Sequence, residues 1–507
     1  MTITTCKKEK RYEADQQSWI QQRIKPEQIE KYLDNGKCFI DIAGIERALT
    51  ENTCPDPKRI RDILQKSLAV ETLTPDETAC LLHVEEPELL AEMQRVAAEV
   101  KVKVYDNRIV TFAPLYLSNF CVNDCHYCSF RRSNDQARRR ILTNEEIRRE
   151  VEVLAGVIGH KRLIVVYGEH PKAGIDYMVS TLQTIAEVKV KTRKSWGQIR
   201  RCNVNAAPLS IEELRLLKDV GIGTFQVFQE TYHRPTYEKV HPGDTLKGHY
   251  LWRLYCMHRS IEAGVDDVGI GALFGLYDWK FEVMALLCHA IELEDKFGIG
   301  PHTISFPRLE PAGNTPFVEN PEHRVDDAAF KRLVTVLRLA VPYTGMILTA
   351  RENAQLRREV LPLGCTQTDA STKIDIGGYA ERLDENQHGE RQQFLLGDTR
   401  SLDDVVRELA KAGHITSFCT AGYRCGRTGQ KIMKLLRSGK EGQYCKLNAI
   451  ITFREWLDDF GSDRTVAVGE KIIAREIEQV KKKMPGVYEQ FLGYYEKTKA
   501  GNRDLYF

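Results

Sequence analysis

The sequence lacks any strong excess of charge and any long apolar segment. Lysine and arginine total 73 against 71 acidic residues in the 507-residue chain. This balance gives no reason to expect nucleic acid or an anionic membrane as the main partner. The first residues contain no apolar run that could act as a signal sequence, and no later segment approaches the length of a membrane span. We therefore expect a cytoplasmic protein that acts on a small molecule, with no nucleic-acid or membrane partner.

Cysteine, by contrast, is not scarce, because the chain has 14. Without a secretory signal, this number favours reduced thiols and metal ligation over a disulfide framework. Several cysteines stand alone in ordinary surroundings and are interpreted as small hydrophobic residues. They are Cys6, Cys38, Cys54, Cys80, Cys202, Cys256, Cys288 and Cys365. The remaining cysteines form two clusters, on which the functional hypothesis rests.

The sequence pattern divides the chain into three parts. Residues 1–105 have apolar positions at helical spacing and a predicted N-cap at Thr74, which indicates a helical N-terminal extension. Residues 106–384 alternate short apolar runs with amphipathic segments, as expected of repeated β-α units. Residues 385–507 return to a helical pattern and contain the second cysteine cluster, so they are predicted to form a helical C-terminal module.

Eight candidate strands lie in the middle part. They cover residues 110–119, 162–169, 199–207, 224–231, 266–276, 302–311, 343–352 and 365–372. Two of the helical segments between them begin with capping-box spacing, one at Thr143 and Glu146 and the other at Ser210 and Glu213. Eight strands that alternate with helices predict an α/β fold, a parallel (β/α)8 TIM-type barrel.

The first cysteine cluster follows the first predicted strand, in the segment NFCVNDCHYCSFRRSN. Cys121, Cys125 and Cys128 are separated by three and then two residues. A loop at the carboxyl end of a barrel strand lies on the catalytic face, and three close thiolates can hold three corners of a 4Fe-4S cube. The alternative is a structural zinc site. Zinc would need a fourth ligand, and His126 lies between two of the cysteines, where reaching the same ion would be sterically awkward.

This motif resembles the signature of radical S-adenosylmethionine (SAM) enzymes, in which an aromatic residue, here Tyr127, precedes the third cysteine. The resemblance implies a radical SAM barrel with a 4Fe-4S cluster, whose open iron binds SAM and cleaves it to a 5'-deoxyadenosyl radical. The second predicted strand ends in Gly168 and Glu169, which resemble the superfamily's element for the SAM amino group. Glycine allows close backbone approach, and a carboxylate pairs with an ammonium group. A chance Gly-Glu pair is the alternative.

Longer segments resemble the HydG family, the tyrosine lyases that mature FeFe-hydrogenase, and the related ThiH family of thiamine synthesis. These segments include FAPLYLSNFCVNDCHYCSFRRSN, NVNAAPLS, FQVFQETYH, DDVGIGALFGLYDW and HTISFPRLEPA. The resemblance implies cleavage of the Cα–Cβ bond of tyrosine, or of a related aromatic amino acid, to p-cresol and dehydroglycine. HydG converts dehydroglycine further to carbon monoxide and cyanide. A flavodoxin or ferredoxin is the electron donor that the resemblance implies.

By the same resemblance, four further residues are candidates. Arg308 would bind the substrate carboxylate with its guanidinium fork, and the alternative is an ordinary surface arginine. Glu230 and Arg253 would contact SAM, or else form a structural ion pair. His289 would bind an extra, non-cubane iron, and a core or surface histidine is the alternative.

The second cysteine cluster departs from the HydG pattern. That family carries a second iron-sulfur cluster on three cysteines spaced two and then twenty-two residues apart, and here the frame is Cys419, Gly422 and Cys445. Cys425 lies three residues beyond the vacant position and could replace the missing ligand, whereas a cube on two thiolates should be labile. Three hypotheses stay open: a HydG-like lyase with a second cluster, a ThiH-like lyase without it, and an iron-sulfur scaffold that does not turn over.

Overall fold

A closed barrel of eight parallel strands forms the centre of the molecule. The computed structural model describes residues 18–381, 387 and 389–507. The barrel strands are β1 (Arg108–Ser118), β2 (Arg162–Tyr167), β5 (Arg201–Asn205), β6 (Phe225–Gln226), β7 (Val268–Gly271), β8 (Thr303–Ser305), β9 (Gly345–Leu348) and β10 (Gln367–Asp369). Each strand pairs with the next, and β10 pairs with β1 through Gln367 and Val110, which closes the sheet. The predicted (β/α)8 barrel is confirmed, and every barrel strand overlaps one of the eight predicted segments.

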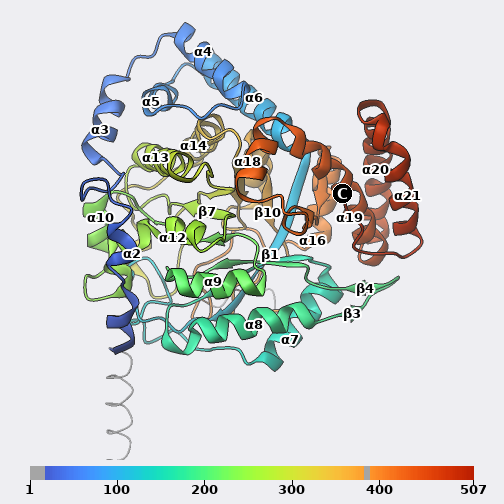
Figure 1. Ribbon diagram of the computed structural model, residues 1–507, viewed down its shortest axis with the longest axis horizontal. Coiled ribbons are helices and arrows are strands. Elements are labelled where there is room, and N and C mark those ends of the chain that lie inside the picture. Colours follow the sequence, from blue (N-terminus) through green and yellow to red (C-terminus); the bar gives the residue numbers. More distant parts are fainter. Residues whose placement is uncertain (1–17, 382–386, 388) are drawn as a thin grey trace, which may run out of the picture.

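Helices surround this barrel (Figure 1). Those between barrel strands are α7 (Asn144–Val153), α8 (Ile175–Glu187), α9 (Ile211–Val220), α10 (Arg234–Val240), α11 (Tyr250–Leu254), α12 (Cys256–Glu262), α13 (Trp279–Phe297), α14 (Asp327–Ala340) and α15 (Ala354–Val360). Short turns are η1 (Leu154–Ile158), η2 (Pro171–Ala173), η3 (Leu246–Gly248), η4 (Pro316–Val318) and η5 (Leu361–Leu363). The hydroxyls of Thr143 and Ser210 accept from the backbone N–H of Glu146 and Glu213, so both predicted capping boxes are confirmed.

The N-terminal extension is helical, as predicted. It contains α2 (Glu27–Glu30), α3 (Ile42–Glu51), α4 (Pro57–Leu68), α5 (Pro75–Leu82) and α6 (Pro87–Tyr105). Thr74 caps α5, as expected, and its hydroxyl accepts from the backbone N–H of Glu77. The long helix α6 packs against α14 on the outside of the barrel and leads directly into β1.

The C-terminal extension is largely helical but also contributes a strand. Its elements are α16 (Leu402–Lys411), β11 (Ile415–Ser417), α17 (Ala421–Arg424), α18 (Gly429–Arg437), α19 (Lys440–Asp459), α20 (Asp463–Lys483) and α21 (Pro485–Lys499). The sequence did not predict β11, which pairs in parallel with the start of β1, from Arg108 opposite Ile415. A small hairpin of β3 (Val190–Lys191) and β4 (Trp196–Gly197) was also not predicted. None of the helices in the described ranges has the length and apolar character needed to cross a bilayer.

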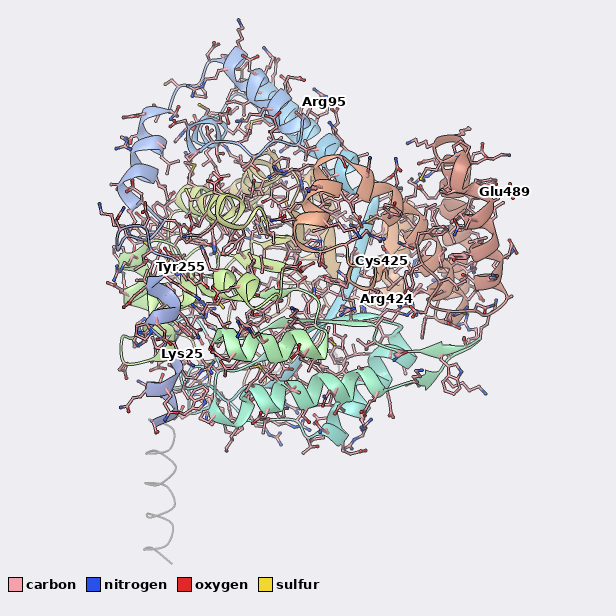
Figure 2. The ribbon with its side chains drawn as sticks, in the orientation of Figure 1. Lys25, Arg95, Tyr255, Arg424, Cys425 and Glu489 are labelled. Carbon is pink, nitrogen blue, oxygen red and sulfur yellow. The ribbon has the colours of Figure 1, made fainter. Side chains whose placement is uncertain are left out.

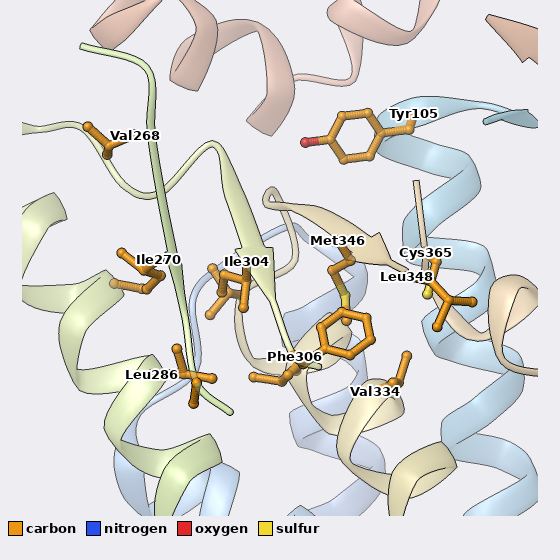
Figure 3. Close-up of a cluster of buried hydrophobic side chains, with 14 of the residues drawn as sticks. Tyr105, Val268, Ile270, Leu286, Ile304, Phe306, Val334, Met346, Leu348 and Cys365 are labelled. Atoms are coloured by element: carbon orange, nitrogen blue, oxygen red, sulfur yellow. The ribbon is translucent and has the colours of Figure 1, made fainter. Parts of the chain in front are cut away.

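Side chains alternate along the barrel strands. One set packs into the hydrophobic core between the strands and the surrounding helices, and the other set faces the barrel interior. Ile304 of β8 and Met346 of β9 point outward and pack among Leu286 of α13 and Val334 of α14 (Figure 3). Because successive strand residues face opposite sides, the neighbouring position Ser305 faces inward and lines a cavity inside the barrel. The outward-facing residues therefore stabilise the fold, and the inward-facing residues are available for binding and catalysis.

Candidate active site

A cavity opens at the carboxyl ends of the barrel strands; we call it the upper cavity. Its walls include Phe112 and Tyr116 of β1, Asn205 of β5, Gln226 of β6 and Asp369 of β10. The loop after β1 closes one side of it and brings all three cysteines of the first cluster to its lining. This is the face on which a barrel of this type carries its active site.

Hydrogen bonds hold the backbone of this loop and two of its three thiols. The backbone N–H of Cys128 donates to the carbonyl of Cys125 at 3.1 Å, which closes the loop. The amides of Asn123 and Gln393 donate to the sulfurs of Cys121 and Cys128 at 3.7 and 3.5 Å. Burial, aided by the neighbouring thiols, raises the pKa of Cys125 to about 12. A cationic cluster bound here would stabilise the thiolate forms.

The described residues do not form a single-ion site at this loop. Among the described residues, no three histidine, cysteine, aspartate or glutamate side chains converge closely enough to share one metal ion. The corners of a 4Fe-4S cube are set farther apart than the ligands of one zinc ion. His126 is exposed and its ring lies beside Phe317, with centroids 6.3 Å apart. The histidine that the zinc alternative would use therefore does not face the three thiols as a fourth ligand.

Gly168 and Glu169 lie directly against the cysteine loop. A Cβ at position 168 would lie 2.1 Å from the carbonyl oxygen of Phe120, so only glycine fits. The Glu169 side chain is buried in the lining of the upper cavity, and its Oε2 accepts from the amide of Asn123 at 2.6 Å. Burial raises the pKa of Glu169. A buried carboxylate that forms no ion pair with any described residue suits the ammonium group of SAM.

Glu230 and Arg253 also line the upper cavity and contact each other. The Oε1 of Glu230 accepts from Nη2 of Arg253 at 3.3 Å and from Nζ of Lys247 at 2.7 Å. The backbone of Glu230 has a φ of +72°, a strained value for a residue with a side chain, and its carbonyl is held by Leu273 N–H at 2.8 Å. Lys247 was missed because no motif marks it. The three charges form a preorganised polar wall for a bound cofactor.

Tyr127 occupies the wall between this charged group and the cysteines. Its hydroxyl forms a 2.7 Å hydrogen bond with Nε2 of His241, and its ring lies under Nζ of Lys247, 5.4 Å from the centroid. The aromatic position of the motif therefore positions the loop and contributes to the cavity surface.

Arg308 is not brought to the upper cavity. Its Nε donates to Glu352 at 3.0 Å, its Nη2 also pairs with Glu352, and its Nη1 donates to Asp327 at 3.0 Å. Arg351 lines the upper cavity instead, with its guanidinium 3.4 Å from the centroid of the Phe394 ring. No ion pair joins Arg351 to a carboxylate in the described part of the chain. The sequence signal for it, an arginine just beyond β9, is no stronger than that for Arg308.

Glu310 lines the same wall as Arg351. Burial, together with the nearby charge of Glu352, raises the pKa of Glu310 to about 7. Within the described residues, the upper cavity thus offers a guanidinium without an ion pair beside a carboxylate whose pKa is raised. This pair matches the two charged groups of a free α-amino acid.

A second, smaller cavity lies at the opposite, amino ends of the strands; we call it the lower cavity. Cys419, Gly422 and Cys445 line it, together with Arg108 and Arg162 at the starts of β1 and β2. Cys425 is not in its lining, and its sulfur lies 3.9 Å from the backbone oxygen of Phe507. The donor set is therefore two thiols, which does not fit a cluster that needs three.

His289 lies outside both cavities. Its Nδ1 pairs with the hydroxyl of Tyr232 at 2.8 Å, its ring packs on Phe39, and burial lowers its pKa to about 3. His302 lines the lower cavity instead, where its Nδ1 pairs with Asp267. Its place immediately before β8 was the available signal, because that position puts a side chain at the lower end of the barrel.

Known proteins share this fold and these motifs. The profile of the Radical SAM superfamily matches residues 115–288. The chain is 32% identical to 2-iminoacetate synthase of Salmonella typhimurium over 355 residues, which cover 69% of this chain and 88% of that protein. A crystal structure of HydG, described as a maturase of the [FeFe]-hydrogenase, is 46% identical and superimposes with a TM-score of 0.87, covering 92% of this chain and all of the other. The chain belongs to this family of radical SAM enzymes.

Further matches agree with this family. The profile of the Biotin and Thiamin Synthesis associated domain matches residues 305–415. HydG from Carboxydothermus hydrogenoformans is 36% identical, with a TM-score of 0.73 over 90% of this chain and 98% of the other. Family membership implies a 4Fe-4S cluster and SAM, so the sequence-based assignment to radical SAM chemistry is confirmed. The residues of the upper cavity described above fit both groups.

Proposed function

We propose that this protein cleaves the Cα–Cβ bond of tyrosine and releases p-cresol and dehydroglycine, which is 2-iminoacetate. The observation that carries the proposal is that one cavity contains both the cysteine loop and the unpaired guanidinium of Arg351. Cys121, Cys125 and Cys128 would hold the 4Fe-4S cluster. When bound, the cluster and SAM would supply a carbon radical able to remove a hydrogen atom from the substrate.

The protein's own side chains would bind and orient both molecules. Glu169 would pair with the ammonium group of SAM, beside the polar wall of Glu230 and Arg253. Arg351, rather than Arg308, would bind the substrate carboxylate, and Glu310 would accept a proton from the substrate ammonium group, leaving a neutral amine. The aromatic walls around Phe112 and Tyr116 would enclose the phenol ring and exclude water. A flavodoxin or ferredoxin would supply the electrons.

We expect the reaction to end at dehydroglycine. Conversion to carbon monoxide and cyanide, as in HydG, would call for a second cluster, and the lower cavity offers two thiols. The ThiH-like outcome is therefore favoured over the HydG-like one. A scaffold that does not turn over is disfavoured. The upper cavity has a wall of charged residues, Glu230, Lys247 and Arg253, which the storage of iron would not require.

The test is an anaerobic reaction of iron-reconstituted protein with SAM, dithionite and tyrosine. We expect 5'-deoxyadenosine and p-cresol in near-equal amounts, with glyoxylate and ammonia from hydrolysis of dehydroglycine. Carbon monoxide and cyanide should stay at the level of a control without tyrosine. Carbon monoxide and cyanide in amounts close to p-cresol would restore the HydG-like function. Absence of 5'-deoxyadenosine would leave the scaffold hypothesis.

A further inference from the structure

The C-terminal extension contributes residues to both ends of the barrel. Its loop around Cys425 (Figure 2) contributes to the lower cavity, whereas residues 391–397, which we call the closing segment, reach the upper cavity. The closing segment forms neither helix nor strand, and the side chains of Gln393, Phe394 and Leu396 line the upper cavity. Residues far from the cysteine motif in the sequence therefore complete the candidate active site.

Backbone hydrogen bonds fix the closing segment on the barrel. The N–H group of Gly397 donates to the carbonyl of Ala350, just after β9, at 2.9 Å. The hydroxyl of Ser129, the residue that follows the third cysteine of the loop, donates to the carbonyl of Gln393 at 3.1 Å. Because both the barrel and the cysteine loop hold this segment, the side chain of Gln393 has a defined position beside the thiols.

The amide of Gln393 has a partner on each of its two sides. Its Nε2 donates to Sγ of Cys128 at 3.5 Å, and its Oε1 accepts from the hydroxyl of Tyr116 at 3.0 Å. A cysteine that binds iron is a thiolate, which accepts hydrogen bonds but cannot donate them, whereas a phenol is protonated at neutral pH and can donate. The two partners therefore fix the orientation of the amide and direct an N–H group at the sulfur.

We propose that Gln393 is a positioning residue for the 4Fe-4S cluster, and that its N–H group raises the reduction potential of the cluster through the Cys128 thiolate. Reduction by one electron from the external donor adds a negative charge to the cluster and its thiolates. A hydrogen-bond donor at sulfur stabilises that more negative state. The proposal rests on the cluster that family membership implies and not on tyrosine as the substrate.

The test is an anaerobic redox titration of the reconstituted full-length protein without SAM, followed by the EPR signal of the reduced cluster. Gln393→Met removes the donor at similar side-chain length and should make reduction about tenfold less favourable, which for one electron lowers the potential by about 59 mV. Gln392→Met is the matched control, because the amide of Gln392 donates to Asp375 at 2.8 Å instead of to sulfur. Its equilibrium constant for reduction should stay within about twofold of the unsubstituted protein. An unchanged potential in Gln393→Met, or an equal shift in Gln392→Met, would overturn the proposal.

Iron content of the same samples separates this role from a merely structural one. A structural role would lower the amount of bound cluster and leave its potential unchanged, whereas the proposed role shifts the potential of the cluster that is bound. Gln393→Asn is the second variant, because it keeps an amide on a shorter side chain, and it should lower the potential as Gln393→Met does. An unshifted potential in Gln393→Asn would overturn the proposal even if Gln393→Met failed to bind a cluster. The titration requires neither SAM cleavage nor tyrosine, so failure of the tyrosine lyase assay would leave its result interpretable.

Discussion

Arg253 at the upper end of the barrel differs from Arg108 and Arg162 at the lower end in its partners. At the upper end Glu230 forms ion pairs with both Lys247 and Arg253, so these cations are paired before any ligand binds. At the lower end Arg108 and Arg162 have no acidic partner in the described part of the chain. A formed ion pair fixes geometry, whereas an unpaired buried guanidinium gains from an anionic ligand. The pairing state of each arginine is thus a better guide to function than its presence.

The two cavities also differ in their number of thiols, and two arginines near the upper cavity, Arg351 and Arg308, differ in their ion pairs. The loop after β1 brings three thiols to the upper cavity, whereas the lower cavity has two, Cys419 on the loop after β11 and Cys445 on α19. Arg351 in the upper cavity forms no ion pair with any described residue, whereas Arg308, after the preceding strand, pairs with Glu352 and Asp327. Each difference can be tested by comparing two matched substitutions.

The largest effect is expected from Cys128→Ala, compared with Cys445→Ala. Loss of Cys128 removes a cluster ligand in the upper cavity, and the rate of 5'-deoxyadenosine formation should fall on the order of 1,000-fold. Cys445→Ala changes only the lower cavity and should alter that rate by about twofold at most. The measurement is 5'-deoxyadenosine by chromatography after anaerobic reduction with SAM. An equal loss in both variants would mean that the two ends do not act independently.

The next effect separates Arg351 from Arg308. Arg351→Gln should raise the KM for tyrosine roughly 10- to 100-fold, because it removes the carboxylate partner, and should leave thermal stability nearly unchanged. Arg308→Gln should instead cost about 3 kcal/mol of stability, because Glu352 would stay buried without its cation. Steady-state kinetics and thermal unfolding of both variants measure this. A raised KM with normal stability in Arg308→Gln would reinstate the residue that the sequence suggested.

The sequence predicted what depends on local patterns and missed what depends on side-chain direction. The strands, the capping boxes at Thr143 and Ser210, and the cysteine loop are all encoded within short segments, so they could be recognised. The position of His289 outside both cavities could not, because it requires knowing which way a side chain on α13 points. The strand β11 has three residues and no periodicity to detect.

The smallest effect is expected at Lys101, a buried lysine of α6 whose pKa is lowered in part by the charge of Arg108. Lys101 is 2% exposed, and its Nζ has no hydrogen-bond partner among the residues that the structure describes. Burial, followed by the charge of Arg108, lowers the pKa of Lys101 to about 7 from an ordinary value of 10.5. Between these two values the unfolded chain binds a proton that the folded chain does not. Stability should therefore rise with pH across this window.

Lys101→Met should remove this penalty. We expect the variant to be more stable by about 2 kcal/mol at pH 7, and the gain should shrink as the pH rises and vanish near pH 10.5. Lys103→Met is the control, because Lys103 lies on the same helix but is exposed, and its effect should stay within about 0.5 kcal/mol. Urea unfolding at several pH values measures both. A pH-independent gain would show that folding does not lower the pKa of Lys101, and that the gain comes from packing alone.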